Sequence, residues 1–289
     1  MADPADESSA APEASAPPAG EGILAWEDDP GQPAPSPLQP VRRPQPDLSH
    51  PRLAITLPGT PPEPSQEVGS EAFRWWAAAE GLARGRDFWA RIVPESTTWV
   101  SDVGPSLQVH LDAPRPELNA YYDRESLRFF HDTVENVTIW SGESPDVVCH
   151  ELGHAVLDGL RPQLWDAAGT EPAAFHEAFG DVTSLLAALE LPELRTQMLS
   201  ETGGKPWRSS RVSRLSERLG WALRTINPGA AEPLCLRDMS NSWFWRDPST
   251  LSPDGPVTVL STEPHLFGRI FTGAFLKALA GMFDLRPGK

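Results

Sequence analysis

Apolar residues recur at roughly helical spacing from about residue 70, where the periodic part of the chain begins. Phe73, Trp76, Leu82 and Trp89 predict one helix. Short alternating or β-rich runs follow and predict strands over 98–103, 107–111, 118–122, 127–130 and 134–140. The later pattern is helical over 146–159, 171–190, 209–225 and 263–282, with Pro and Gly breaks between these segments. The sequence therefore predicts an α+β fold, with a β-rich N-terminal lobe and a helical C-terminal lobe.

The first part of the chain lacks this periodicity. Residues 1–65 contain half of the 32 prolines, and acidic side chains outnumber basic ones there. Such a segment has too little apolar surface to offset the entropy of ordering it. We expect a disordered acidic arm over 1–68, with the apolar cluster 22–26 unattached, then a lobe of one helix and β-strands over 69–148 and a helical lobe over 149–289.

Charge and composition disfavour some classes of binding partner and indicate a cellular compartment. The formal net charge is −16, which disfavours nucleic acid and anionic membranes. The longest apolar run, 271–283, is short and contains Lys277, so no membrane span is expected. Two cysteines, Cys149 and Cys235, suit a reducing compartment, and the acidic start lacks the features of a signal peptide. We expect a cytoplasmic protein; secretion by another route or as a processed form stays open, as does the oligomeric state.

One segment of the predicted helix 146–159 carries candidate chemistry. It reads His150-Glu151-Leu152-Gly153-His154. Histidines four residues apart lie on one helical face, so that two imidazoles can bind the same Zn²⁺ ion. Glu151 lies beside that face, where it can take a proton from water instead of binding the metal.

The next predicted helix offers the third ligand. A histidine ligand in the same segment is excluded, because Leu157 and Leu160 occupy the positions where such a motif would continue. Glu177 can complete a set of two histidines and one glutamate. Asp181 shares a face with Glu177 and can accept the free ring N–H of His150, which would fix its tautomer.

These residues resemble the thermolysin-like zinc peptidases, a gluzincin family. The similarity extends over residues 70–282 and includes Asp146–Val156, Glu177–Asp181, the segment Asn119-Ala120-Tyr121-Tyr122, Arg237–Ser240 and His265–Ile270. The resemblance implies a zinc site in the cleft between the two lobes. It also implies that Asn119 and Ala120 belong to an edge strand that binds the peptide substrate, and that Arg237 and His265 stabilise the polarised carbonyl.

Several positions depart from the family pattern. Trp165 stands where the family has a tyrosine that donates to the oxyanion, and an indole N–H has a different reach. Leu260 stands where a carboxylate would orient His265, which leaves Glu263 as a substitute. Asp146 matches a calcium ligand, but Ala188 replaces a second one, so calcium binding is doubtful.

The sequence thus predicts a compact or truncated zinc metallopeptidase that acts on peptides or proteins. No exopeptidase motif is found, which favours an endopeptidase. The departures at Trp165 and Leu260 leave one alternative open, a zinc-binding scaffold protein with weak activity or none. The preference for substrate side chains does not follow from the sequence.

Overall fold

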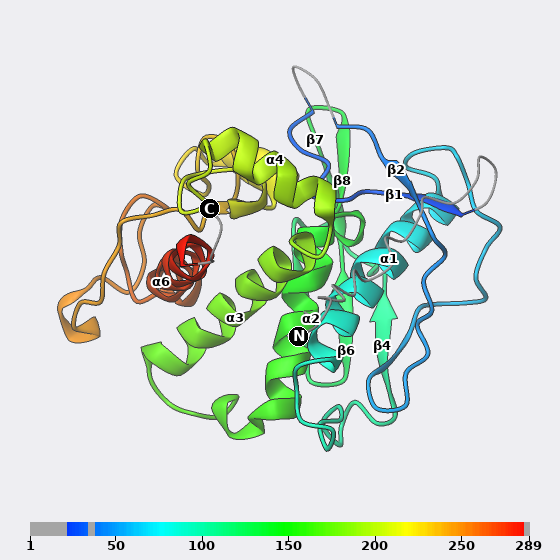
Figure 1. The fold of residues 1–289 in the computed structure, drawn as a ribbon, viewed down its shortest axis with the longest axis horizontal. Coiled ribbons are helices and arrows are strands. Elements are labelled where there is room, and N and C mark those ends of the chain that lie inside the picture. The colour runs from blue at the N-terminus through cyan, green and yellow to red at the C-terminus, as the bar shows by residue number, and fades with distance from the viewer. Residues whose placement is uncertain (1–21, 34–37, 286–289) are drawn as a thin grey trace, which may run out of the picture.

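The computed structural model describes residues 22–33 and 38–285 and shows a mixed α+β fold with several small sheets (Figure 1). Helices α2 (Pro145–Leu160) and α3 (Thr170–Ala188) pack against each other, and α1 (Glu71–Ala90) and α6 (Pro264–Asp284) flank them. The other helices are α4 (Pro192–Thr202) and α5 (Glu217–Ile226), with short 3₁₀ helices at Ser141–Glu143, Pro162–Leu164, Arg211–Ser213 and Pro248–Thr250. The strands are β1 (Ile23–Ala25), β2 (Val41–Arg43), β3 (Ala54–Thr56), β4 (Ser106–His110), β5 (Ala120–Tyr122), β6 (Ser126–Phe129), β7 (His131–Val134), β8 (Val137–Trp140), β9 (Arg214–Leu215) and β10 (Arg237–Asp238).

Local sequence signals set the start of the two helices that matter most. Ser70 caps α1 by accepting the N–H of Phe73, and Ser144 caps α2 by accepting the N–H of Val147. Pro145 takes the first position of α2, where its missing N–H costs no hydrogen bond. The start of α2 places His150 in its second turn and His154 in its third.

The largest sheet has the strand order β3-β4-β6-β5. β3, β4 and β6 run parallel, and β5 pairs antiparallel with β6, with Tyr122 opposite Leu127. The sheet and α1 and α2 share one core, in which Leu82, Leu107 and Leu127 are fully buried. β5 is therefore an edge strand, and it contacts α2.

Several predicted elements differ from the observed ones. Residues 98–103 form irregular backbone and a turn instead of a strand, and the run 134–140 belongs to the hairpin of β7 and β8. Glu135 and Asn136 both have positive φ, as a tight hairpin turn requires. Helix α4 begins at Pro192, a residue that the sequence analysis took as a break, because proline suits the first turn of a helix. The predicted helix 209–225 is helical only over α5, after a 3₁₀ turn and β9.

The expected disorder of residues 1–68 is wrong for 22–33 and 38–68, and the remainder of that segment lies outside the described residues. β1 pairs with β2, and Ile23 and Ala25 are completely buried. Trp26 packs edge-to-face on Phe73 of α1, with ring centroids 5.8 Å apart. The cluster 22–26 thus has a partner in α1, although composition alone indicates too little apolar surface for order.

Charged residues attach the same segment to the body of the protein. Asp28 and Asp29 are buried, and Asp28 forms an ion pair with Arg211 at 2.8 Å. Asp29 accepts hydrogen bonds from the Ser144 hydroxyl and from the Arg218 backbone N–H. The basic stretch 209–218 thus binds the N-terminal segment: the Arg211 side chain pairs with Asp28, and the Arg218 side chain donates to the carbonyl of Gly31.

Asp146, the residue that matches a calcium ligand, lies in this carboxylate cluster. Its Oδ2 accepts the backbone N–H of Ser216 at 2.7 Å. Burial raises the pKa of Asp146, and the neighbouring Asp28 and Asp29 raise it further. Within the described residues, no metal-ligand group includes Asp146.

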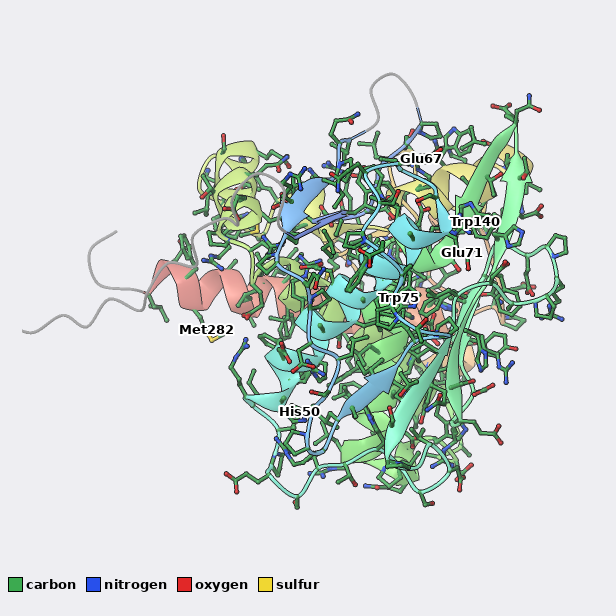
Figure 2. All side chains as sticks on the ribbon, turned by 90° about the vertical axis from the view of Figure 1, so that its right-hand side faces the viewer. His50, Glu67, Glu71, Trp75, Trp140 and Met282 are labelled. Atoms are coloured by element: carbon green, nitrogen blue, oxygen red, sulfur yellow. The ribbon has the colours of Figure 1, made fainter. Side chains whose placement is uncertain are left out.

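Helix α6 projects from the remainder of the structure towards Met282 (Figure 2). By length and composition, α6 is apolar enough to cross a membrane. Only the shorter run 271–283 was considered in the sequence analysis, and it is too short for that. The most apolar window of α6 is 44% buried in the protein, and core helices of soluble proteins meet the same criterion. Its N-terminal half contributes to the candidate site.

Candidate metal centre

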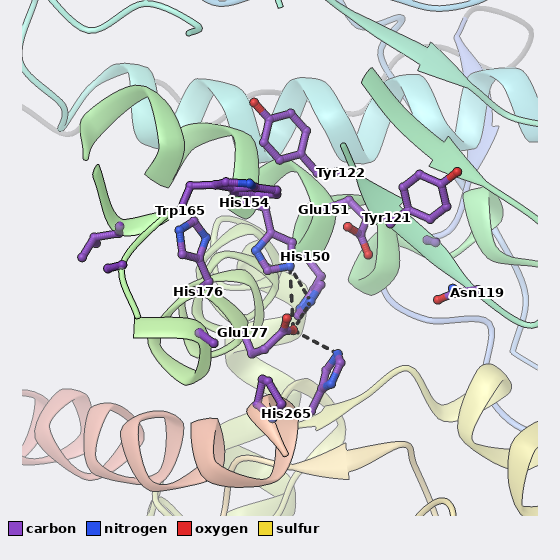
Figure 3. A pocket seen from close by; sticks show the side chains of 15 residues that line it. Asn119, Tyr121, Tyr122, His150, Glu151, His154, Trp165, His176, Glu177 and His265 are labelled. Carbon is purple, nitrogen blue, oxygen red and sulfur yellow. Dashed lines mark hydrogen bonds and ion pairs between the residues drawn. The ribbon is translucent and has the colours of Figure 1, made fainter. Parts of the chain in front are cut away.

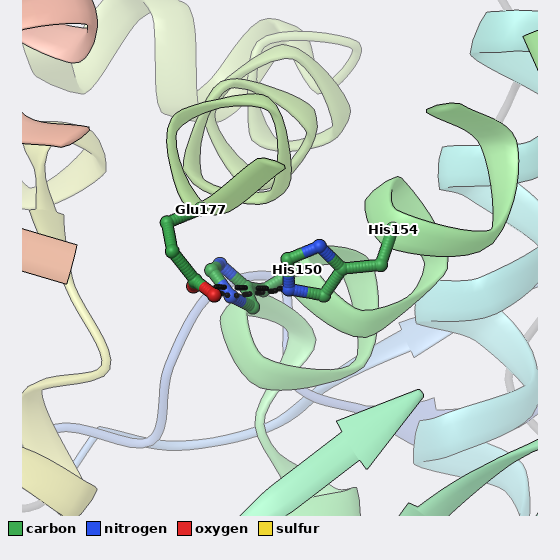
Figure 4. Close-up of side chains that lie close together, drawn as sticks. All are labelled: His150, His154 and Glu177. Carbon is green, nitrogen blue, oxygen red and sulfur yellow. Dashed lines mark hydrogen bonds and ion pairs between the residues drawn. The ribbon is translucent and has the colours of Figure 1, made fainter. Parts of the chain in front are cut away.

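His150 and His154 lie on one face of α2, as their spacing predicts. Both side chains are buried, and their Nε2 atoms are 3.2 Å apart. Glu177 of α3 points at the same place, with its Oε2 atom 3.2 Å from His150 Nε2 and 3.8 Å from His154 Nε2 (Figure 4). Ligands at 2.0–2.1 Å from a tetrahedral ion lie about 3.3 Å from each other. The three atoms therefore have the spacing of a metal-ligand set.

The chemistry of the donor set also fits a cation. Glu177 Oε2 is buried and accepts no conventional hydrogen bond from the described residues. Burial opposes the charge of Glu177, but the positive charge of His265 outweighs it and holds the pKa of Glu177 well below the usual range. Burial lowers the pKa of His154 to about 3, so this imidazole is neutral and able to bind a metal.

Two glycines bring α2 and α3 close enough for this geometry. A Cβ at Gly153 of α2 would lie 2.8 Å from the Cα of Gly180 on α3. A Cβ at Gly180 would lie 2.6 Å from His150 Nδ1. The absence of side chains at this crossing lets Glu177 reach the two histidines.

Asp181 and Arg237 hold His150 from behind. His150 Nδ1 lies 2.9 Å from Asp181 Oδ1, which matches the predicted contact. Arg237 donates from Nε and Nη2 to the two oxygens of Asp181 at 2.8 and 2.7 Å. Burial opposes the negative charge on Asp181, but Arg237 and His150 outweigh it and lower its pKa. Burial disfavours protonation of His150, yet Asp181 and Glu177 raise its pKa to about 9 in the metal-free site, so a cation would bind His150 in competition with a proton.

Glu151 is buried beside the three proposed ligands and lines the pocket into which they open. Burial raises its pKa to about 7, although the positive charge of His150 opposes this shift. A carboxylate with such a pKa accepts and releases a proton near neutral pH. Glu151 therefore suits proton transfer.

The ligand set opens into a pocket of about 410 Å³ (Figure 3). Asn119 and Ala120, both predicted to bind substrate, line this pocket at the edge strand β5. The Asn119 side chain donates to Glu117 at 3.1 Å. Ala120 begins the strand whose outer edge pairs with no other described strand.

His265 is in the first turn of α6 and reaches the ligand set. Its Nε2 is 3.0 Å from Glu177 Oε2, and its Nδ1 is 2.6 Å from Glu263 Oε1. Glu263 thus provides the carboxylate that Leu260 lacks. Desolvation opposes the positive charge of His265, but Glu177 and Glu263 outweigh it and raise its pKa to about 10.

Trp165 also lines the pocket and is 37% exposed. Its ring packs at right angles to that of His176 and close to perpendicular to that of Tyr122, with centroids 5.5 Å away in both cases. The Tyr122 hydroxyl donates to the buried Asp158. Tyr122 belongs to the predicted substrate-binding segment, whereas Asp158 was not predicted to belong to the site, although it follows His154 by four residues and so shares its side of α2.

The structure brings most of the predicted residues to one pocket, while Arg237 binds Asp181 behind His150 and lines a neighbouring pocket. No protein-family model, curated protein or solved structure matches the chain. The geometry and chemistry of the site are therefore what bear on its function.

Proposed function

We propose that the protein is a zinc-dependent peptidase, most simply an endopeptidase, whose metal ligands are His150, His154 and Glu177. The observation that supports this most is the spacing of the three ligand atoms, 3.2–3.8 Å from one another, next to the buried Glu151. Two imidazoles and one carboxylate suit zinc, and three protein ligands leave a position for a reactant. Zinc bound there would supply Lewis acidity towards a water molecule and a peptide carbonyl.

Glu151 is the proposed general base. It would take a proton from the attacking water and then deliver it to the leaving amine, so that one residue serves both halves of the reaction. Its carboxyl is buried next to the proposed ligands, and burial raises its pKa in the metal-free site, which favours proton uptake. A metal site with a purely structural role needs no such residue.

His265 and Arg237 are the proposed partners of the carbonyl oxygen. His265 borders the pocket, and Glu263 Oε1, 2.6 Å from its Nδ1, favours a positive charge on the ring, so that it can donate a hydrogen bond to a developing oxyanion. Arg237 commits Nε and Nη2 to Asp181, which leaves Nη1 for a substrate carbonyl and gives Arg237 a second role in holding His150. Trp165 would contribute less to stabilising the oxyanion than a tyrosine at this position.

The substrate is proposed to be an extended peptide. The edge of β5 offers main-chain groups for an added strand, and Asn119 and Ala120 place that edge beside the metal ligands. In this proposal the pocket is the cleft between the β-rich lobe and the helical lobe. A peptide that lies along β5 and continues on both sides of the cleaved bond is the substrate of an endopeptidase.

The test combines metal analysis with cleavage of an unbiased peptide library. We expect about one zinc per chain, removable by chelators, and internal cleavage of peptides that stops when zinc is removed. His154→Ala should lose most of the zinc and the activity. Full zinc occupancy in His154→Ala protein would contradict the ligand assignment.

The same experiment distinguishes the alternative of a zinc-binding scaffold. A scaffold would hold zinc at His150, His154 and Glu177 but cleave no peptide in the library. The replacement of the family's tyrosine by Trp165 is the feature that favours this alternative, and the presence of Glu151 disfavours it.

A further inference from the structure

His176 is a polar residue whose hydrogen-bonding capacity the protein leaves unused. It precedes Glu177 on α3, is 7% exposed, and lines the pocket of the metal ligands. Both of its ring nitrogens are buried and have no hydrogen-bond partner among the described residues. Because buried polar groups are nearly always paired, an imidazole with two unpaired nitrogens at a pocket indicates a partner that arrives with a ligand.

The surroundings of His176 are mainly aromatic and aliphatic. The ring of Trp165 stands at 90° to it with centroids 5.5 Å apart, and the ring of His154 is 5.8 Å away (Figure 3). Leu164, Ala167 and Ala173 line the same pocket. A rotation of the imidazole about its Cβ–Cγ bond, or a shift of the half-exposed Trp165 ring, would present a nitrogen to a ligand there.

The charges near His176 select the kind of ligand. Glu177 is adjacent in sequence, so a carboxylate would be repelled. Asp158, which accepts from the Tyr122 hydroxyl, also accepts from Nε and Nη2 of Arg124 at 3.0 Å, so the charges of this ion pair largely cancel. The Arg124 guanidinium lies 5.5 Å from the Trp165 ring, which disfavours a cation there. An uncharged amide or hydroxyl remains, and each carries both a donor and an acceptor, so that it pairs with either tautomer of the imidazole.

We infer that His176 is a specificity-determining residue of the proposed peptidase, and that it hydrogen-bonds an uncharged polar side chain of the substrate close to the scissile bond. The inference rests on the proposed function for its setting. Trp165 and the small residues around it would hold the aliphatic part of that side chain, and His176 would recognise its polar end.

The test compares pairs of peptides that differ only by Gln or Met at one position, because these side chains have similar length and only Gln forms hydrogen bonds. Library cleavage by the zinc-loaded full chain first identifies the position where polar residues are preferred. We expect the Gln peptide to have a kcat/KM at least about tenfold above that of the Met peptide. His176→Phe should remove this ratio at unchanged zinc content, His176→Gln should retain part of it, and His110→Phe, at an exposed position, should leave it unchanged.

An absence of polar preference at every position, or the same preference in His176→Phe protein, would overturn the inference. If the wild-type chain cleaves no peptide, the proposed function fails but His176 is still tested by binding of peptides to the zinc-loaded chain. Tighter binding of Gln than of Met peptides that disappears in His176→Phe supports the inference. Equal binding overturns it. If His176→Phe does not fold, His176→Gln is used in both measurements, and the expected result is then a reduced preference; an unchanged preference overturns the inference.

Discussion

At the scale of single residues, environment decides which form each ionisable group takes. His154 and His150 are four residues apart on one helix, yet burial lowers the pKa of His154 to about 3, whereas Asp181 and Glu177 overcome burial and raise that of His150 to about 9. The carboxyl of Glu151 has a raised pKa and that of Glu177 a lowered one. Two carboxyl groups with opposite shifts suit opposite tasks, proton transfer and metal binding.

Glu151→Gln separates these tasks. The amide has nearly the same shape as the carboxylate and leaves the three proposed ligands intact, so zinc content should stay near that of the wild type. Turnover should fall at least about 10²-fold, because an amide cannot accept the proton. Metal analysis and peptide cleavage on the same sample check this, and a joint loss of zinc and activity would mean that Glu151 is structural or a ligand.

His265→Ala tests oxyanion stabilisation. The loss of one such donor typically lowers kcat by about 10²–10³, and KM should change little. Trp165→Tyr is the companion variant and should preserve or raise activity, since a tyrosine hydroxyl is a more adaptable donor than an indole N–H. An unchanged kcat in His265→Ala protein would remove His265 from the proposed mechanism.

At the scale of elements, the crossing of α2 and α3 controls the metal site. Ser144 and Pro145 set where α2 begins, but the reach of Glu177 depends on the glycine contact between the two helices. Helix pairs approach this closely only where side chains are absent at the crossing, because a Cβ would meet the opposite backbone.

Gly180→Ala should therefore disturb metal binding. The added methyl would lie 2.6 Å from His150 Nδ1, so the imidazole must move away from Asp181. We expect a clear loss of zinc affinity in a competition titration. Gly281→Ala is the control, because a Cβ there meets nothing within 4 Å; it should bind zinc normally and gain up to about 1 kcal/mol of stability from helix propensity.

At the scale of the whole molecule, the segment 22–33 is part of the folded body. It combines apolar burial at Trp26 with ion pairing at Asp28, and both contacts join residues that are distant in sequence. Glu143 lies near this junction, next to Trp26 and within the field of Arg74 and Arg218.

Trp26→Ala should destabilise the protein by about 3–5 kcal/mol, the usual cost of truncating a buried tryptophan. Denaturant unfolding followed by circular dichroism measures this change. Trp245→Ala, at a 56% exposed position, should change the free energy of unfolding by under about 1 kcal/mol. Equal effects of the two substitutions would show that Trp26 is not packed in solution.

Glu143 predicts a pH dependence of stability. Burial raises its pKa to about 7, although Arg74 and Arg218 oppose the shift. The folded state thus binds this proton more tightly than the unfolded state, so its contribution to stability is lost as pH rises from about 4.5 to 7. Glu143→Gln should remove this pH-dependent loss in the free energy of unfolding, which is at most about 3 kcal/mol. At pH 8 the variant should therefore be more stable than the wild type. Thermal unfolding across this pH range checks it, with the exposed Glu95→Gln as the control.

Those parts of the site that depend on local spacing could be predicted from the order of residues along the chain. Histidines at 150 and 154 share a helical face wherever the helix lies, because the backbone repeats every 3.6 residues. The same rule places Glu177 and Asp181 on one face of the next helix. The mixed α+β class also follows from local periodicity, since strands and helices repeat apolar residues at different intervals.

The contacts between distant segments, in contrast, depend on how the whole chain folds. Local periodicity does not indicate that Gly153 faces Gly180 or that Asp28 pairs with Arg211. It also does not indicate that the carboxylate beside His265 comes from Glu263. The expected disorder of residues 22–33 and 38–68 was wrong for this reason. Composition measures how much apolar surface a segment has, whereas its order depends on the complementary surface and charge that the folded body presents to it.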